Sequence, residues 1–191
     1  KKKIIGSFRE PFSGKKYLYL TKEGNDFLGG SENPPSISRA TLIHDAKVVE
    51  LVLEFMKLES IYGFELEHQI RDMKSFGRTY QICPDAVMLG QKGKTKFKLA
   101  IELELTRKTK EKYLSKIGHY LSSSYYDFVV YYFQSRGVMN SYMKHIRDKY
   151  GDESDRKILY VLNEKLLTNK FNFDESIAFH KNKEGRLENV F

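Results

Sequence analysis

Three carboxylates in the middle of the chain are spaced so that they could share one ligand. Glu102 and Glu104 alternate with apolar residues in the stretch 99–105. Because side chains alternate along a β-strand, both glutamates project from the same face. Asp85 directly precedes a second apolar stretch, residues 86–89, which a short turn pairs with the glutamate strand. We therefore expect the three carboxylates to converge on one point.

Hard oxygen donors on a rigid sheet edge suit Mg²⁺ or Mn²⁺, with water and a substrate phosphate completing the octahedron. Carboxylates a few ångströms apart repel one another, and a bound cation removes that repulsion. The cation also lowers the pKa of a bound water and stabilises charge that develops on a phosphate. The pattern predicts a metal site formed by Asp85, Glu102 and Glu104. The alternative is that both glutamates form the solvated face of an antiparallel strand, which is a common pattern.

The segments around these acids alternate between strand and helix. Runs of apolar, β-branched and aromatic residues predict strands at 63–70, 86–89, 97–105, 128–133 and 157–162. Apolar residues at helical spacing predict helices at 38–58, 109–121 and 139–150. This order predicts an α/β domain whose central mixed β-sheet is flanked by helices.

The predicted helix at residues 38–58 carries two further candidates. Asp45 falls on the side of its expected apolar stripe, where an unpaired carboxylate is costly and needs a partner. His44 could orient a phosphate or act as a general base, although a histidine in the first turns of a helix is more often a structural hydrogen-bonding residue. The stripe expected to pack consists of Leu42, Ala46, Val49, Leu53 and Met56, and the polar stripe of Lys47, Glu50, Glu54 and Lys57.

The first part of the chain is predicted to form a unit of its own. Residues 3–8 and 15–21 favour a β-hairpin, and a short helix follows from Thr21. A loop rich in glycine and proline at residues 29–36 marks the boundary, so we expect domains at residues 1–33 and 34–191. The chain begins without methionine and inside a predicted strand, so we expect that an N-terminal piece of the natural polypeptide is missing.

The charge balance favours a polyanionic partner such as nucleic acid. The chain of 191 residues has 33 lysines and arginines against 25 acids, a net charge of +8. Arg107, Lys108 and Lys110 leave the strand that carries the glutamates, and we expect them to contact phosphates. Tyrosines lie between the basic residues and could stack on unpaired bases: Tyr113, Tyr120, Tyr125, Tyr142 and Tyr150. The alternative is that these tyrosines pack in the core and the basic residues only face solvent.

Several classes of protein are excluded because the residues or motifs that they need are rare or missing in the sequence. A single cysteine, Cys83, rules out an internal disulfide and a cysteine-based zinc cluster, and favours a reducing compartment. The histidines are scattered singly, and no glycine-rich loop has the spacing of a nucleotide-binding loop. No run of 18 apolar residues is present. We expect a soluble, cytoplasmic protein with no membrane partner.

The acidic pattern also carries a family resemblance. Pro84-Asp85, a hairpin turn, and Glu102-Leu103-Glu104 on an apolar strand followed by a helix resemble the core of PD-(D/E)XK nucleases. The resemblance implies a restriction-endonuclease-like fold and a metal-dependent DNA endonuclease, with Asp85, Glu102 and Glu104 holding Mg²⁺ or Mn²⁺. Glu104 occupies the place usually held by lysine. Lys108 or Lys116 could supply that lysine instead; the alternative is that both belong to the solvated surface of the helix.

A narrower resemblance covers most of the chain. The order of several short motifs along the chain is similar to that in plasmid replication-relaxation proteins and MobC-type relaxases. These motifs are Tyr17 to Gly24, Leu42 to Asp45, Pro84-Asp85, Ile101 to Thr109, and Lys116 with Tyr120. It implies that residues 1–33 keep the wing of a winged helix, and that the chain nicks one strand at a plasmid transfer origin. The DNA, single-stranded near the nick, and accessory relaxosome proteins would be its partners. Either water or a tyrosine could be the nucleophile.

Two other functions stay open. The same fold could belong to a DNA-binding replication or transfer accessory protein that has lost its chemistry, which the absence of the usual lysine favours. It could also belong to a nuclease of restriction or repair, which cuts both strands or cuts without regard to sequence.

Overall fold

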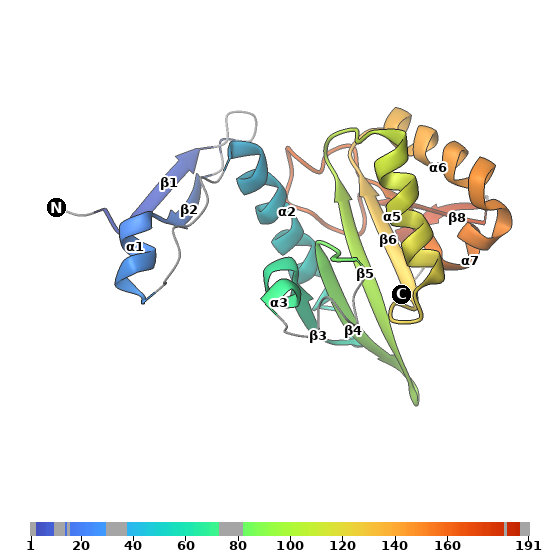
Figure 1. Cartoon of the computed structure of the whole chain (residues 1–191), viewed down its shortest axis with the longest axis horizontal. Helices are drawn as coiled ribbons and strands as arrows, with labels where there is room; N and C mark the ends of the chain where they lie inside the picture. Colours follow the sequence, from blue (N-terminus) through green and yellow to red (C-terminus); the bar gives the residue numbers. More distant parts are fainter. Residues whose placement is uncertain are drawn as a thin grey trace.

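The computed structural model describes residues 3–9, 14, 16–29, 38–72, 82–181 and 183–187, and it has α/β architecture. A seven-stranded mixed sheet forms its centre, and helices cover both faces (Figure 1). The prediction of an α/β fold with a central mixed sheet flanked by helices is confirmed. None of the helices in the described ranges is long and apolar enough to cross a membrane.

The sheet has a parallel centre and antiparallel pairs on both sides of it. Its order is β3-β4-β5-β6-β7-β8-β9, with β5, β6 and β7 parallel and the outer pairs antiparallel. The strands are β3 (Ile61–Leu66), β4 (Ala86–Lys92), β5 (Thr95–Glu104), β6 (Phe128–Phe133), β7 (Ile158–Leu162), β8 (Ile177–His180) and β9 (Lys183–Arg186). The long β5 lies near the middle, and its C-terminal part, residues 99–104, is buried.

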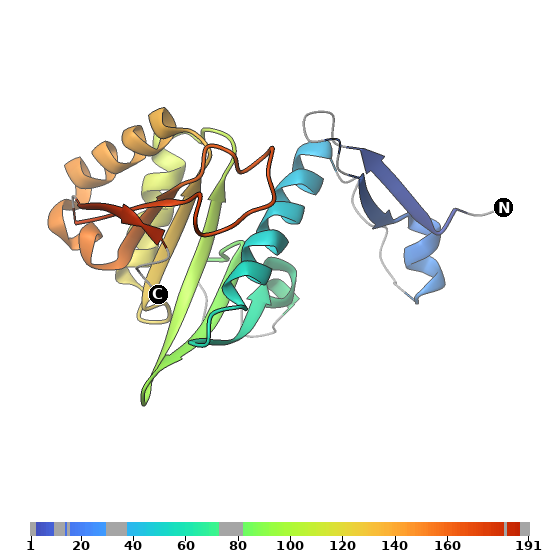
Figure 2. The same cartoon turned by 180° about the vertical axis from the view of Figure 1, so that it is seen from behind.

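The helices divide between the two faces of the sheet. Figures 1 and 2 show α5 and α6 on one face and α2 on the other. Their bounds are α2 (Arg39–Phe55), α3 (Glu67–Asp72), α5 (Lys110–Ser122), α6 (Arg136–Tyr150), the 3₁₀ turn η1 (Gly151–Glu153) and α7 (Ser154–Lys157). Serine side chains cap α2 and α6, where Ser38 accepts from the Thr41 amide and Ser135 from the Val138 amide.

The alternation along β5 decides which layer each carboxylate meets. Ala100 packs in the core beneath α5 and α6, whereas Ile101 and Leu103 pack in the core beneath α2. Glu102 and Glu104 have the parity of Ala100 and therefore face α5 and α6. The predicted shared face of the two glutamates is confirmed, but the alternative of a solvated face is wrong because both are buried.

The packed face of α2 differs from the predicted stripe. Val49 and Leu53 are 41% and 58% exposed. The residues that contact the sheet are Val48, Leu51, Val52 and Phe55. Lys47, predicted to be polar surface, is fully buried. Its amine donates to Glu50 at 2.8 Å and to the Asn169 carbonyl at 2.9 Å, and these partners compensate its burial.

The first predicted core strand also ends earlier than expected. The sequence favoured a strand over residues 63–70, but β3 ends at Leu66 and α3 begins at Glu67. The side chain of Gln69 accepts a hydrogen bond from the Leu66 amide at 2.8 Å. This local contact satisfies the backbone where the strand stops and the helix starts.

The predicted N-terminal hairpin is confirmed. β1 (Ile5–Arg9) pairs with β2 (Lys16–Leu20) as a separate two-stranded sheet, and α1 (Lys22–Phe27) follows with Thr21 as its cap. Figures 1 and 2 show this unit beyond the N-terminal end of α2. The loop expected at residues 29–36 lies outside the described residues except for Gly29. Its identity as part of a winged helix stays a prediction.

The buried lysine of α2 gives a test of this packing. We expect Lys47→Ala to lower the free energy of unfolding by about 3 kcal/mol, because breaking a buried ion pair leaves Glu50 without its cation. Lys57→Ala is the matched control, since Lys57 pairs with Glu54 but is 63% exposed, and it should cost less than about 0.5 kcal/mol. Urea denaturation measures both values. Equal small losses would show that Lys47 is not packed in this way.

Candidate active site

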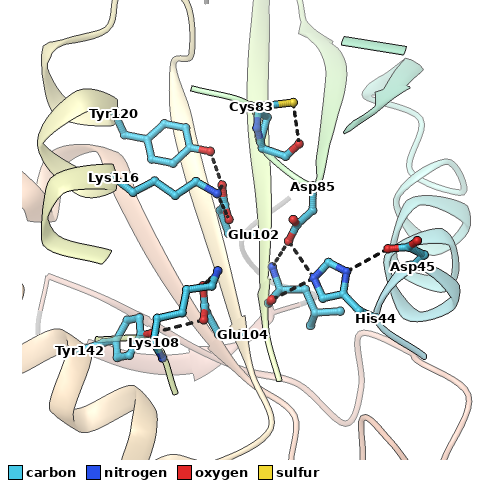
Figure 3. A network of polar contacts seen from close by, with 12 residues as sticks. His44, Asp45, Cys83, Asp85, Glu102, Glu104, Lys108, Lys116, Tyr120 and Tyr142 are labelled. Atoms are coloured by element: carbon cyan, nitrogen blue, oxygen red, sulfur yellow. Dashed lines mark hydrogen bonds and ion pairs between the residues drawn. The ribbon is translucent and has the colours of Figure 1, made fainter. Parts of the chain in front are cut away.

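Glu102 lies at the centre of the candidate site. Its side chain is completely buried, and the ammonium of Lys116, on α5, lies 2.6 Å from its carboxylate. The hydroxyl of Tyr120 donates to the same carboxylate. Lys116 and Tyr120 are four residues apart, so they lie on one side of α5 and reach the same group (Figure 3).

Glu104 has an equivalent pair of donors. Lys108, in the connection between β5 and α5, lies 2.5 Å from its carboxylate. The hydroxyl of Tyr142, on α6, donates to Glu104 at 3.2 Å and also accepts from the Lys108 amide at 3.3 Å. Glu104 thereby ties the end of β5 to α6 and to the connection that leads into α5.

Asp85 is held from the opposite side. It precedes β4, and its carboxylate accepts from the Leu103 amide at 2.7 Å and lies 3.3 Å from Nε2 of His44. The other ring nitrogen of His44 lies 3.2 Å from the carboxylate of Asp45. Figure 3 shows Asp85 facing His44 on α2, whereas Glu102 faces Lys116 on α5.

The electrostatics of the acidic groups follow from burial and from these partners. Burial raises the pKa of Glu102 to about 7, against the lowering effect of Lys116. Burial likewise raises the pKa of Glu104, against the effect of Lys108. Burial alone would raise the pKa of Asp85, but the hydrogen bond and charge of His44 hold it below its ordinary value.

The pKa values of the two cationic groups are also raised. Burial alone would lower the pKa of Lys116, but the charges of Glu102 and Asp85 raise it. Burial alone would lower the pKa of His44, but its hydrogen bonds and charge interactions with Asp45 and Asp85 raise it to about 10. His44 is therefore an imidazolium at neutral pH, and each buried carboxylate has a cation of the protein beside it.

The structure brings most of the predicted site residues together. Lys116 interacts electrostatically with Asp85, Glu102 and Glu104, so the three carboxylates lie within reach of one cation. Both lysines proposed as replacements, Lys108 and Lys116, contact a site carboxylate. Across the described ranges, however, no three His, Cys, Asp or Glu side chains stand close enough to form a ready-made metal site.

The structure decides two points about the surroundings of the site. Asp45 was expected on the packed side of its helix, but its side chain is 61% exposed; it lines the cavity against Asp85, and His44 is the partner that its position was expected to need. Tyr113, Tyr120 and Tyr142 do not stack on bases but follow the alternative, since all three are buried in the core between the sheet and the helices α5 and α6. Their rings complete the apolar faces of these amphipathic helices.

The basic residues proposed to contact DNA lie at the surface beside this site. Arg107, Lys108 and Lys110 are exposed between the end of β5 and the first turn of α5. The guanidinium of Arg107 donates to Ser141 on α6 at 3.3 Å. These charges therefore border the site without being buried in it.

Comparisons with protein-family models, with curated proteins and with solved structures find no match for this chain. Its function therefore has to be argued from the chemistry of the site itself.

Access to the site differs between its carboxylates. A cavity of about 230 Å³ lies against Asp85, and its wall includes His44, Asp45, Glu67 and His68. Glu102 is not part of this wall and has no exposed surface. Asp85 is therefore the acid that a ligand can approach directly.

Reasoning from the sequence did not identify the two tyrosines as hydrogen-bond donors to the glutamates. Tyr120 follows Lys116 by four residues, and in a helix this separation places both side chains on one face. That spacing could have identified Tyr120 as a partner of Glu102. Tyr142 lies on another helix, and its contact with Glu104 depends on how α6 packs.

The raised pKa of His44 predicts a pH dependence of stability. Its folded pKa of about 10 exceeds the ordinary value of 6.5, so its contribution is complete below pH 6.5 and is lost as the pH rises through 10. We expect His44→Ala to be less stable than wild type by about 2 kcal/mol at pH 6, and this difference to shrink toward zero above pH 10. Urea denaturation of both proteins across this range measures it.

The control for this series is His68→Ala, which removes an exposed histidine at the same cavity. It should differ little in stability from wild type, because its side chain is exposed. A difference for His44→Ala that is constant from pH 6 to pH 10 would contradict the assigned ion pair with Asp85.

Proposed function

We propose that this chain is a metal-dependent DNA endonuclease of the PD-(D/E)XK type. The observation that carries the proposal is the order α2-β3-α3-β4-β5-α5-β6, with Asp85 before β4, Glu102 in β5 and Lys116 on the following helix within reach of both acids. The restriction-endonuclease-like fold is part of this proposal, as is the assignment of residues 1–33 to a partial winged helix.

The donor set suits the cation that this activity requires. Asp85 and Glu102 offer hard oxygen ligands and interact electrostatically with each other, and Glu104 lies beyond Glu102 on the same strand face. The buried hydroxyl of Tyr131 beside them lacks a partner among the described residues. Mg²⁺ or Mn²⁺ held here would polarise a phosphate and lower the pKa of a water.

Residues of the chain itself would do the remaining work. The ammonium of Lys116 would stabilise negative charge that develops on the phosphate, in the role of the lysine that Glu104 replaces. Lys108 would do the same from the side of Glu104. His44 would hold Asp85 ionised and oriented, since its imidazolium favours the charged carboxylate.

The surroundings of the tyrosines favour water as the nucleophile. Burial and the charge of Glu102 raise the pKa of Tyr120 well above its ordinary value, so its reactive phenolate is disfavoured. Burial and Glu104 act on Tyr142 in the same direction. A water activated at the carboxylates meets no such barrier.

The narrower proposal is a strand-nicking relaxase at a plasmid transfer origin. It is supported by the sequence resemblance to replication-relaxation proteins and MobC-type relaxases, in particular by His44-Asp45, Pro84-Asp85 and Lys116 with Tyr120. Its partners would be plasmid DNA and accessory relaxosome proteins, and its compartment the cytoplasm. A restriction or repair nuclease would use the same residues, but would cut both strands or cut without sequence preference.

A second candidate function is a DNA-binding accessory protein without catalysis. The observation that favours it is that Asp85, Glu102 and Glu104 each already have a cation of the protein beside them. A divalent cation would have to displace Lys116 from Glu102. If that exchange is unfavourable, the fold binds DNA through its basic residues alone.

The decisive test is nicking of supercoiled plasmid DNA with Mn²⁺, with and without EDTA. We expect Glu102→Gln to lower the nicking rate at least about 100-fold, because it removes a charged ligand while keeping the side-chain shape. Glu111→Gln, an exposed acid in the first turn of α5, is the matched control and should retain full activity. Nicking by Glu102→Gln at the wild-type rate would refute the nuclease proposal. DNA binding without Mn²⁺ binding would favour the accessory protein.

The DNA interface can be tested separately from catalysis. We expect Arg107→Ala and Lys110→Ala each to weaken DNA binding and to reduce the slope of log K against log salt by about 0.9, since each removes one phosphate contact. Lys183→Ala, an exposed residue on β9, should leave the slope unchanged. Fluorescence anisotropy at several salt concentrations measures these slopes. Equal slopes for all three variants would place the interface elsewhere.

A further inference from the structure

Tyr131 carries a buried hydroxyl that the site described above does not use. It lies on β6, its ring is buried, and its hydroxyl has no hydrogen-bond partner in the part of the chain that the structure describes. A buried polar group without a partner is rare in folded proteins, because desolvation of the group is then uncompensated. Such a group calls for an explanation.

The position of Tyr131 relates it to the carboxylates. In the parallel pairing of β5 with β6, Tyr131 is the register partner of Glu102, so the two side chains project from the same face at the same level. Burial raises the pKa of Tyr131, and among nearby charges that of Glu102 raises it most, followed by those of Glu104 and Asp85. The hydroxyl thus lies in the electric field of all three acids.

The neighbouring tyrosines show what a hydroxyl does at this site. Tyr120 donates to Glu102, and Tyr142 donates to Glu104. Together with Lys116 and Lys108, they occupy the carboxylates in the structure described here. Tyr131 is a third phenol in the same group of side chains. Among the described residues, its hydroxyl donates no hydrogen bond.

A divalent cation at Glu102 would compete with the ammonium of Lys116 for the same oxygens. Lys116 would then withdraw as a donor, and the buried carboxylate would need another one to satisfy its remaining lone pairs. Tyr131 stands at the same register position, and its hydroxyl has no partner among the described residues.

We propose that Tyr131 is a positioning residue for divalent-cation binding, donating a hydrogen bond to Glu102 once the cation has displaced Lys116. The inference rests on the proposed metal-dependent function and assigns a residue that this function alone does not require. Tyr131 acts through Glu102: it stabilises the carboxylate in the orientation that the cation needs. Groups that orient ligands in this way typically change metal affinity by about 10- to 100-fold when removed.

Tyr132 is a matched control within the same strand. Its hydroxyl is also buried without a hydrogen-bond partner in the described ranges, but its side chain points to the opposite face of the sheet. There its ring packs edge-on against Phe55 and Phe171. Burial alone raises the pKa of Tyr132, which separates it from the charges of the carboxylates.

The test compares Tyr131→Phe with Tyr132→Phe by calorimetric titration with MnCl₂ and by thermal unfolding with and without MnCl₂, both in the absence of DNA. Without Mn²⁺ we expect both variants to unfold at or slightly above the wild-type temperature, because each loses only an unpaired buried hydroxyl. With Mn²⁺ we expect wild type and Tyr132→Phe to bind equally and to gain the same thermal shift. Tyr131→Phe should bind Mn²⁺ at least about tenfold more weakly and gain a smaller shift.

The outcomes separate this inference from the function on which it rests. Wild-type affinity in Tyr131→Phe, together with loss of binding in Glu102→Gln, would overturn the role of Tyr131 and leave the metal site intact. Equal weakening in both tyrosine variants would also overturn it, because it would show a general packing effect. No Mn²⁺ binding by wild type would overturn both proposals. Failure of Tyr131→Phe to fold without Mn²⁺ would overturn the inference as well, since the hydroxyl would then have a structural partner.

Discussion

The ion pair between Glu102 and Lys116 is the interaction around which the candidate site is arranged. A carboxylate in the centre of a sheet loses its hydration, and the loss is tolerable only if a cation and further donors replace the water. Lys116 and Tyr120 provide these from α5. The pair therefore fixes both the height and the rotation of α5 over β5.

The same requirement connects all three layers of the molecule. Glu104 contacts α6 through Tyr142, and Asp85 contacts α2 through His44. Asp85 also accepts from the Leu103 amide, so the backbone of β5 takes part in the network. Polar networks of this kind are stable only when their members are satisfied together, and they specify one arrangement of the surrounding elements.

Some of this arrangement was predictable because it follows from the period of a strand. The alternation at residues 99–105 fixed the common face of Glu102 and Glu104, and the hairpin brought Asp85 alongside. The packed face of α2 was not predictable, because Val49 and Leu53 are apolar but exposed, and Lys47 is charged but buried. The burial of Lys47 depends on its hydrogen bond to the carbonyl of Asn169, which lies far along the chain.

The sequence also could not predict that the Tyr131 hydroxyl has no hydrogen-bond partner among the described residues. Residues 128–133 form a uniformly apolar and aromatic run, which predicts a buried strand but not which polar atoms find partners. Likewise the cations beside the three acids come from α2, from α5 and from the connection between β5 and α5. Their convergence is a property of tertiary packing rather than of local spacing.

The bond from Lys47 to the Asn169 carbonyl spans 122 residues of sequence. Contacts between such distant segments form late, because the loop between them has to close first. During synthesis on the ribosome, α2 emerges long before its partner segment and has to wait for it. His44 lies one turn before Lys47 on the same helix, so the contact with Asn169 helps to hold the helix that carries the partner of Asp85. The acidic centre is thus supported by a contact that becomes possible only after residue 169 has been synthesised.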